Sequence, residues 1–172
     1  GDEAAGTEIA DFGAASEQNA EHCASQNDVH VCIDGYCDEP SQSFFAVFDG
    51  NGGSDCARFA AETLHATLAD ELPDVDDGSF EAGSATTRYT AGEDEVRGAL
   101  TRSFASTDAV LERNGMGAMP ETGCTVAACL VRREHGRRFL YVANVGDSRA
   151  VLSQGGQALS LIHISEPTRP LS

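Results

Sequence analysis

Residues Phe44-Phe45-Ala46-Val47-Phe48-Asp49-Gly50-Asn51-Gly52-Gly53 join an apolar run directly to an acid and a glycine-rich turn. The apolar run predicts a buried strand. Asp49 then lies where a rigid strand ends and a flexible turn begins. Such a position can hold a carboxylate still while the backbone approaches a ligand. Asp-Gly and Asn-Gly are also common turn pairs, so a strand followed by an ordinary turn is the alternative interpretation.

A second stretch repeats this arrangement, from the apolar run Leu140–Val145 through Gly146-Asp147-Ser148-Arg149 into a further apolar run, Ala150–Leu152. Together the two stretches resemble the PP2C (PPM) family of metal-dependent protein serine/threonine phosphatases. That family has one strand that ends in DGHGG and a later strand that ends in VGDSRA. The second match is nearly letter for letter, whereas the first has Asn51 where the family has histidine. The resemblance covers roughly residues 12–161, with gaps.

The resemblance implies an α+β fold, a layered α/β/β/α sandwich of two antiparallel sheets packed face to face with helices outside, here incomplete. It implies that Phe12–Gln18 forms the first strand and that Val29–Ile33 forms another. We expect a loose terminus at 1–10, a partial phosphatase-like domain at 11–161 with a surface loop or insertion at 74–92, and a tail at 162–172 that is foreign to the family and resembles read-through.

Apolar side chains recur every four residues along Ser54–Leu72 and at helical spacing along Glu93–Asn114. Both patterns predict amphipathic helices, which we expect to lie together against one sheet. Further strands are predicted at Gly123–Val131, Phe139–Val145 and Ala150–Ser153, with a last strand at Gln157–Leu161 after a glycine turn.

The resemblance also implies a site for two divalent metals, Mg²⁺ or Mn²⁺, that activate a bridging water to attack phosphoserine or phosphothreonine. Asp49 matches the carboxylate that bridges both metals, and the backbone carbonyl of Gly50 matches another ligand. Asp28 matches an acid that holds metal-bound water. Asp147 matches an acid near an additional, weaker metal position. Hard cations of this kind prefer oxygen ligands.

Several groups that the resemblance implies are missing. Asn51 replaces the histidine proposed as general acid, and an amide does not donate a proton usefully near neutral pH. Between Asn19 and Asp28 there is no Arg or Lys to grip the phosphate, so His22 is the one cationic candidate there. Two further metal-binding aspartates belong to a later part of the family's domain. The sequence therefore leaves two functions open: a phosphatase, or an impaired phosphatase-like module that binds partners.

The composition limits the classes of molecule that we expect the chain to bind. The net charge of −17 argues against binding to nucleic acid or to an anionic membrane. It suits a protein that attracts divalent cations, and equally a merely soluble acidic surface. The six cysteines form no CxxC pair, and several lie in apolar runs, so we expect a reducing compartment, cytoplasmic or nuclear. We further expect a monomer that acts on phosphoprotein substrates, with no membrane span.

Overall fold

The computed structural model describes residues 9–18, 20–21, 25–75, 85–116, 122–134 and 136–161, of which 85–91 are described by their backbone only. Within these residues, two antiparallel sheets and two helices form an α+β fold, which confirms the predicted class. The elements in chain order are β1 (Val29–Asp34), a 3₁₀ turn η1 (Tyr36–Asp38), β2 (Gln42–Asn51), α1 (Asp55–Glu71), α2 (Ala85–Arg113), β3 (Gly123–Glu134), β4 (Arg137–Val145), β5 (Val151–Gln154) and β6 (Gln157–Ser160).

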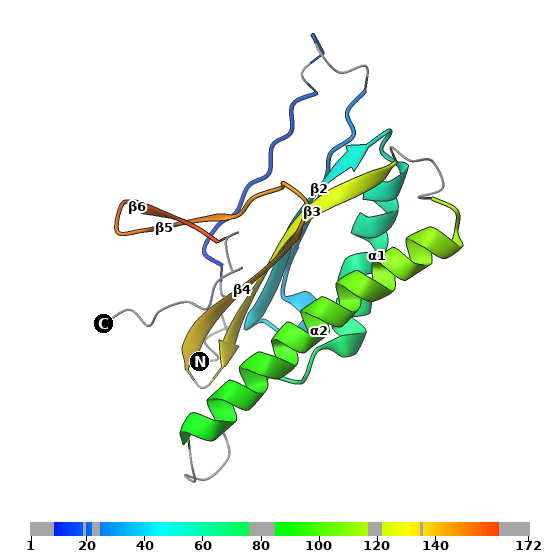
Figure 1. Cartoon of the computed structure of the whole chain (residues 1–172). Coiled ribbons are helices and arrows are strands. Elements are labelled where there is room, and N and C mark those ends of the chain that lie inside the picture. Colours follow the sequence, from blue (N-terminus) through cyan, green and yellow to red (C-terminus); the bar gives the residue numbers. More distant parts are fainter. Residues whose placement is uncertain are drawn as a thin grey trace.

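The main sheet has the strand order β1-β2-β3-β4, and each pair of neighbours is antiparallel. Both helices connect β2 to β3 and cover one face of this sheet, as Figure 1 shows. The prediction that the two helices pack together on one sheet is therefore confirmed. None of the helices in the described residues is long and apolar enough to span a bilayer.

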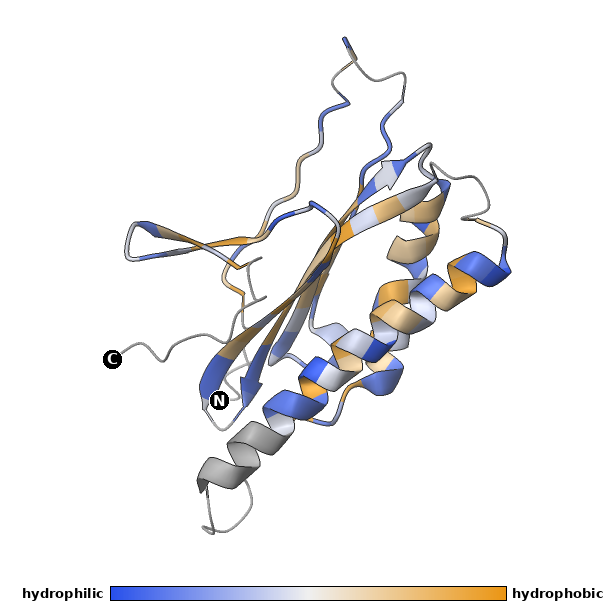
Figure 2. Ribbon diagram, in the orientation of Figure 1, coloured by the Kyte–Doolittle hydropathy of each residue, from blue (hydrophilic) through white to orange (hydrophobic). Residues whose placement is uncertain are grey.

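The core lies between this sheet face and the helices. Alternate residues of β2, among them Phe44 and Phe48, are almost fully buried and point toward the helices. Leu64 and Leu68 of α1 complete the layer, and so does Val96 of α2. The four-residue spacing predicted this stripe on α1, because positions i and i+4 of a helix share one face. Figure 2 shows the apolar bands running along the strands and along the inner sides of the helices.

The second helix is longer than the sequence predicted. α2 begins at Ala85, so residues 85–92 of the expected surface loop are helical. The run Gly83 to Gly92 is rich in Gly and Thr, which have low helix propensity, and it lacks the apolar spacing that revealed the rest of α2. A helix that is anchored further along by Val96 and Leu100 can extend into such a stretch, because each added residue costs far less than nucleation.

The face of the main sheet opposite the helices is covered only in part. The Phe12 ring packs against Phe45 in a tilted arrangement, with ring centroids 5.4 Å apart, yet residues 9–18 form no strand, which corrects the expectation for Phe12–Gln18. The second sheet, β5–β6, has two strands that pair only with each other. Residues 9–18 lie beside no strand that could exchange backbone hydrogen bonds with them among the described residues, so they do not form a β-ladder.

In the expected face-to-face sandwich, the second sheet is therefore much smaller than the main sheet. Almost every residue of the β5–β6 hairpin is exposed, including Val151 at 61%. In Figure 1 the hairpin projects on the side of the sheet away from the helices. Val47 of β2 and Leu140 of β4 remain 49% and 40% exposed on that face. A two-stranded hairpin is too narrow to bury a four-stranded sheet, and within the described residues no helix covers the hairpin.

Two glycine turns follow β4 and β5 but differ in their surroundings. Gly146, directly after β4, has φ +87°, and a Cβ atom there would lie 2.6 Å from the Cβ of Thr125 on β3. Gly155, in the β5–β6 turn, has φ +59° with no atom within 4 Å of the corresponding position. Both turns need the left-handed conformation that glycine adopts readily. Only at Gly146 is there also no room for a side chain.

We therefore expect Gly146→Ala to lower the free energy of unfolding by roughly 2–4 kcal/mol, because it adds a collision with β3 to the backbone strain. Gly155→Ala, the matched control, should cost roughly 1 kcal/mol, since it carries the strain alone. Urea denaturation of both variants measures the difference. Equal losses would contradict the close contact between the Gly146 turn and Thr125.

Candidate functional site

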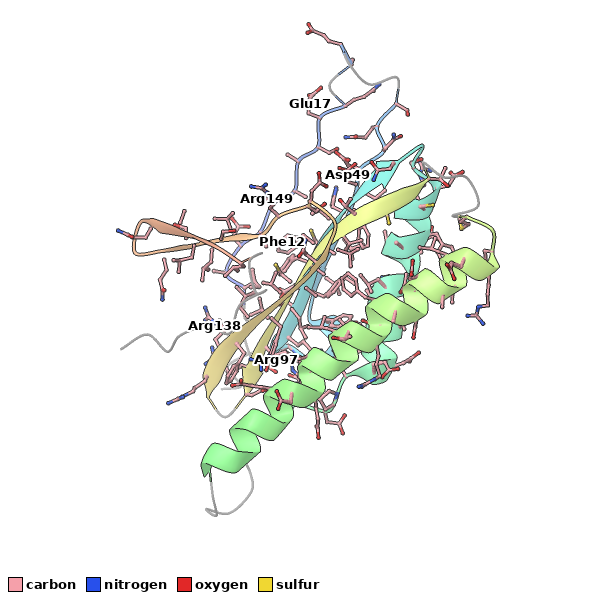
Figure 3. All side chains as sticks on the ribbon, viewed as in Figure 1. Phe12, Glu17, Asp49, Arg97, Arg138 and Arg149 are labelled. Atoms are coloured by element: carbon pink, nitrogen blue, oxygen red, sulfur yellow. The ribbon has the colours of Figure 1, made fainter. Side chains whose placement is uncertain are left out.

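Three aspartates far apart in the sequence reach the same end of the main sheet. Asp28 immediately precedes β1, Asp49 lies near the end of β2, and Asp147 follows β4. The strand register explains the convergence: Val29 pairs with Phe48, which places Asp28 level with Asp49. Figure 3 shows Asp49 at this end together with Glu17, whereas Arg97 and Arg138 lie toward the other end of the sheet.

The third carboxylate, that of Asp147, is positioned by the pairing of β3 with β2 and β4. Asp49 pairs with Thr125, and the next pair along β3 joins Val126 to Val145, the last residue of β4. The loop that carries Asp147 therefore starts beside the strand that flanks Asp49. The structure thus brings together the three carboxylates that the sequence singled out.

The environment of Asp49 raises the pKa of its carboxyl group. The largest cause is partial burial, followed by the negative charges of Asp28 and Asp147 and by a side-chain hydrogen bond with Asp28. Each of these effects favours the protonated acid over the carboxylate. In the described residues, no group of three or more His, Cys, Asp or Glu side chains is already arranged to hold a metal ion. The carboxylates at this site therefore repel one another, and protonation of Asp49 reduces that repulsion.

A cavity of about 280 Å³ opens at Asp28 and Asp49. Polar side chains that the sequence analysis did not single out also line it: Ser16, Glu17, His30 and Ser148. His30 could have been found, because it follows Asp28 by two residues on a strand and so shares its face. Glu17 could not, because residues 9–18 form no regular element whose period would place it.

Of the predicted site residues that the structure describes, Asp28 and Asp49 line this cavity, whereas Gly50, Asn51 and Asp147 do not. Asn51, at the end of β2, is exposed and does not line it. His22, the candidate cation for phosphate, lies outside the described residues.

Gly50 allows the chain segments that carry Asp28 and Asp49 to approach each other. A Cβ atom on Gly50 would lie 2.5 Å from the backbone oxygen of Gly53 and 2.9 Å from that of Asn27. It would also touch the Cβ of Ala57 in the first turn of α1, at 3.3 Å. Because any larger residue would push the Asn27 segment away, Gly50 is a structural requirement of the site, whatever its carbonyl binds.

Side-chain hydrogen bonds fix the loop that carries Asp147. The Asn144 amide nitrogen donates to the backbone oxygens of Gly146 and Ser148, at 3.1 and 3.2 Å. The hydroxyl groups of Ser148 and Thr125 are hydrogen-bonded to each other. Since Thr125 is the register partner of Asp49, these bonds tie the Asp147 loop directly to the strand next to Asp49. Asn144 and Thr125 are therefore positioning residues for the carboxylate site.

Comparison with known proteins identifies the family. The family model described as Protein phosphatase 2C matches residues 10–170, which extends past Leu161, where the sequence analysis expected the resemblance to end. The rice (Oryza sativa subsp. japonica) protein Probable protein phosphatase 2C 30 is 36% identical over 145 residues, covering 76% of this chain and 33% of the relative. The human protein Probable protein phosphatase 1N is 37% identical over 134 residues, covering 76% of this chain and 26% of the relative.

A yeast relative, Protein phosphatase 2C homolog 1 of Saccharomyces cerevisiae, is 28% identical over 169 residues, which cover 88% of this chain and 52% of the relative. The chain therefore spans between 26% and 52% of the length of these three curated relatives. The family match covers nearly the whole chain, and it includes both motif stretches and all three clustered aspartates. The chain belongs to the protein phosphatase 2C family.

Proposed function

We propose that the whole protein hydrolyses phosphoserine and phosphothreonine in protein substrates with the help of Mg²⁺ or Mn²⁺ bound at the carboxylate site. The observation that carries this proposal is the convergence of Asp28, Asp49 and Asp147 at one sheet end, which raises the pKa of Asp49 through burial and like charge. Family membership supports the same reaction class.

The chemistry of the three side chains suits a divalent cation. All three side chains offer carboxylate oxygens, the ligand type that Mg²⁺ and Mn²⁺ prefer. Asp28 and Asp49 share a hydrogen bond that favours the protonated acid, and a cation can take the place of that proton while neutralising both groups. We assign Asp49 and the Gly50 carbonyl as direct ligands. Asp28 would hold metal-bound water, and Asp147 would serve a weaker position.

When bound, the cations supply a water of lowered pKa and neutralise phosphate charge. The chain's own residues have other tasks. Asn144 and Thr125 hold the Asp147 loop in place. The hydroxyl groups of Ser16 and Ser148 line the cavity, where each can donate a hydrogen bond to a phosphate oxygen. Asn51 can donate a hydrogen bond but no proton, so the proton of the leaving alcohol must come from another group or from solvent.

A second candidate function follows from Asn51. A family member that lacks the histidine at this position could bind phosphoproteins without turning them over. The same cavity and carboxylates would then serve recognition alone. The two functions predict the same metal affinity and differ in turnover.

We further propose phosphoprotein partners, a monomeric state and a cytoplasmic or nuclear location. The cysteines in the described residues, Cys32, Cys37, Cys56, Cys124 and Cys129, carry free thiols, which is the usual state in a reducing compartment. The net charge of −17 disfavours nucleic acid and anionic lipid as partners.

The pKa of Asp49 gives a pH-dependent prediction. Because its folded-state pKa is raised above the ordinary 3.8, the folded chain holds this proton more tightly than the unfolded chain. Stability is therefore lost as the pH rises through the folded pKa. Without divalent cations, Asp49→Asn should be more stable than the parent chain at neutral pH, and the gain should vanish as the pH falls toward the ordinary value.

Urea denaturation at a series of pH values with a metal chelator measures this difference. Asp70→Asn, an exposed acid near the end of α1, is the matched control and should show no comparable pH-dependent gain. A less stable Asp49→Asn variant at neutral pH would contradict the like-charge description of the site.

Hydrolysis of a phosphothreonine peptide by the whole protein with excess Mn²⁺ tests the proposed activity. Asp49→Asn should lower kcat/KM by about a hundredfold or more, because removal of groups that hold or orient a metal costs factors of this size. Asp70→Asn should retain the parent rate. Asn51→His should raise kcat by about tenfold or more, since it restores a general acid.

Two outcomes are informative. A peptide that binds but is not hydrolysed would favour the recognition function. Turnover that survives Asp49→Asn would refute the assignment of Asp49 as a metal ligand. We expect the 172-residue chain alone to bind Mn²⁺ weakly and to lack turnover, because the resemblance implies two further aspartates that these residues do not supply.

A further inference from the structure

A second cavity, of about 350 Å³, lies between α1, α2 and the start of β3. It is on the helix side of the main sheet, whereas the carboxylate cavity opens on the other face. Its walls are largely apolar and come from all three elements, including Leu64 of α1, Phe104 and Leu111 of α2, and Val126 of β3. The apolar part of this lining favours contact with a small hydrocarbon group.

One polar group in the wall has no partner. Thr107 of α2 is 5% exposed, and its Oγ1 forms no hydrogen bond with any residue that the structure describes. Ser103, one turn earlier, is fully buried, and its hydroxyl donates to the backbone oxygen of Leu100 at 2.9 Å. The helix backbone thus satisfies Ser103 and leaves Thr107 free. A buried hydroxyl that lines a cavity without a partner is costly, and a ligand with a hydrogen-bonding group would remove that cost.

Two carboxylates in the cavity wall favour a positively charged ligand. Asp108 and Glu112 line the same cavity from exposed positions of α2, four residues apart on one side of the helix. Neither forms an ion pair with another described residue. Like charges at this spacing repel each other, so a cation between them is favoured. An anionic ligand such as a fatty acid is correspondingly disfavoured.

We propose that this cavity binds a small primary amine with an aromatic or branched hydrocarbon body. The hydrocarbon fills the apolar space between the helices and β3. The ammonium group donates hydrogen bonds to Thr107 Oγ1 and to the carboxylates of Asp108 and Glu112. A neutral hydrocarbon would leave the Thr107 hydroxyl unsatisfied, and an alcohol would leave the carboxylates unneutralised.

Titration calorimetry of the 172-residue chain with phenethylamine tests the proposal, with phenethyl alcohol as the uncharged match. The amine should bind saturably with one site per chain. The alcohol should bind about tenfold more weakly or worse, because it lacks the charge-assisted hydrogen bonds. No saturable binding of the amine, or equal affinity for the alcohol, would overturn the proposal.

Variants separate this site from a general attraction of amines to an acidic chain. Thr107→Val keeps the side-chain shape and removes a hydroxyl that has no partner, so the fold is retained. It should raise the melting temperature of the free chain while weakening amine binding about fivefold. The double variant Asp108→Asn with Glu112→Gln should bind the amine no better than the alcohol.

Glu95→Gln, an exposed acid on the same helix, is the matched control and should leave amine affinity unchanged. A general charge effect would make Glu95→Gln weaken amine binding as much, per neutralised acid, as the double variant does, and that result would refute the site. Amine affinity that is insensitive to both Thr107→Val and the double variant would refute it as well.

Discussion

The pairing of β2 with β3 is the constraint on which the site depends. This register sets Asp49 opposite Thr125 and Gly50 opposite Cys124. Thr125 in turn carries the hydrogen bond to Ser148 that fixes the Asp147 loop. A slip of one residue would turn the side chain of every β2 residue to the other face, burying Asp49 among the helices. The buried Phe44 and Phe48 prevent such a slip, so the apolar core defines where the charges lie.

The same packing concentrates negative charge at the carboxylate site. Gly50 lets the Asn27 backbone come close, which brings the carboxylate of Asp28 to that of Asp49. Repulsion between these groups lowers the stability of the cation-free fold, and a bound cation would recover it. On the opposite face of the sheet, the cavity beside α2 shows a related pattern: among the described residues, the Thr107 hydroxyl has no hydrogen-bond partner and the two acids Asp108 and Glu112 have no ion-pair partner. Acidic groups in both places are set against rigid apolar surfaces.

Local periodicity and motif spacing predicted much of this structure and missed what depends on longer contacts. The stripe on α1 and the strand that ends at Asp49 follow directly from side-chain spacing. The early start of α2 could not be predicted, because its first turns carry weak helix formers and gain their order from later packing. Phe12–Gln18 is not a strand because no strand among the described residues pairs with it. The tie between Thr125 and Ser148 required the register, which a single sequence does not reveal.

Crystals grown with Mn²⁺ and measured near the manganese absorption edge would test most directly whether the register builds a cation site. The anomalous difference map should place a Mn²⁺ ion within coordination distance of the Asp49 carboxylate, with Asp28 contacting the ion directly or through water. A map without a peak at this end of the sheet would contradict that account. So would a Mn²⁺ ion held only elsewhere, for example between Asp108 and Glu112.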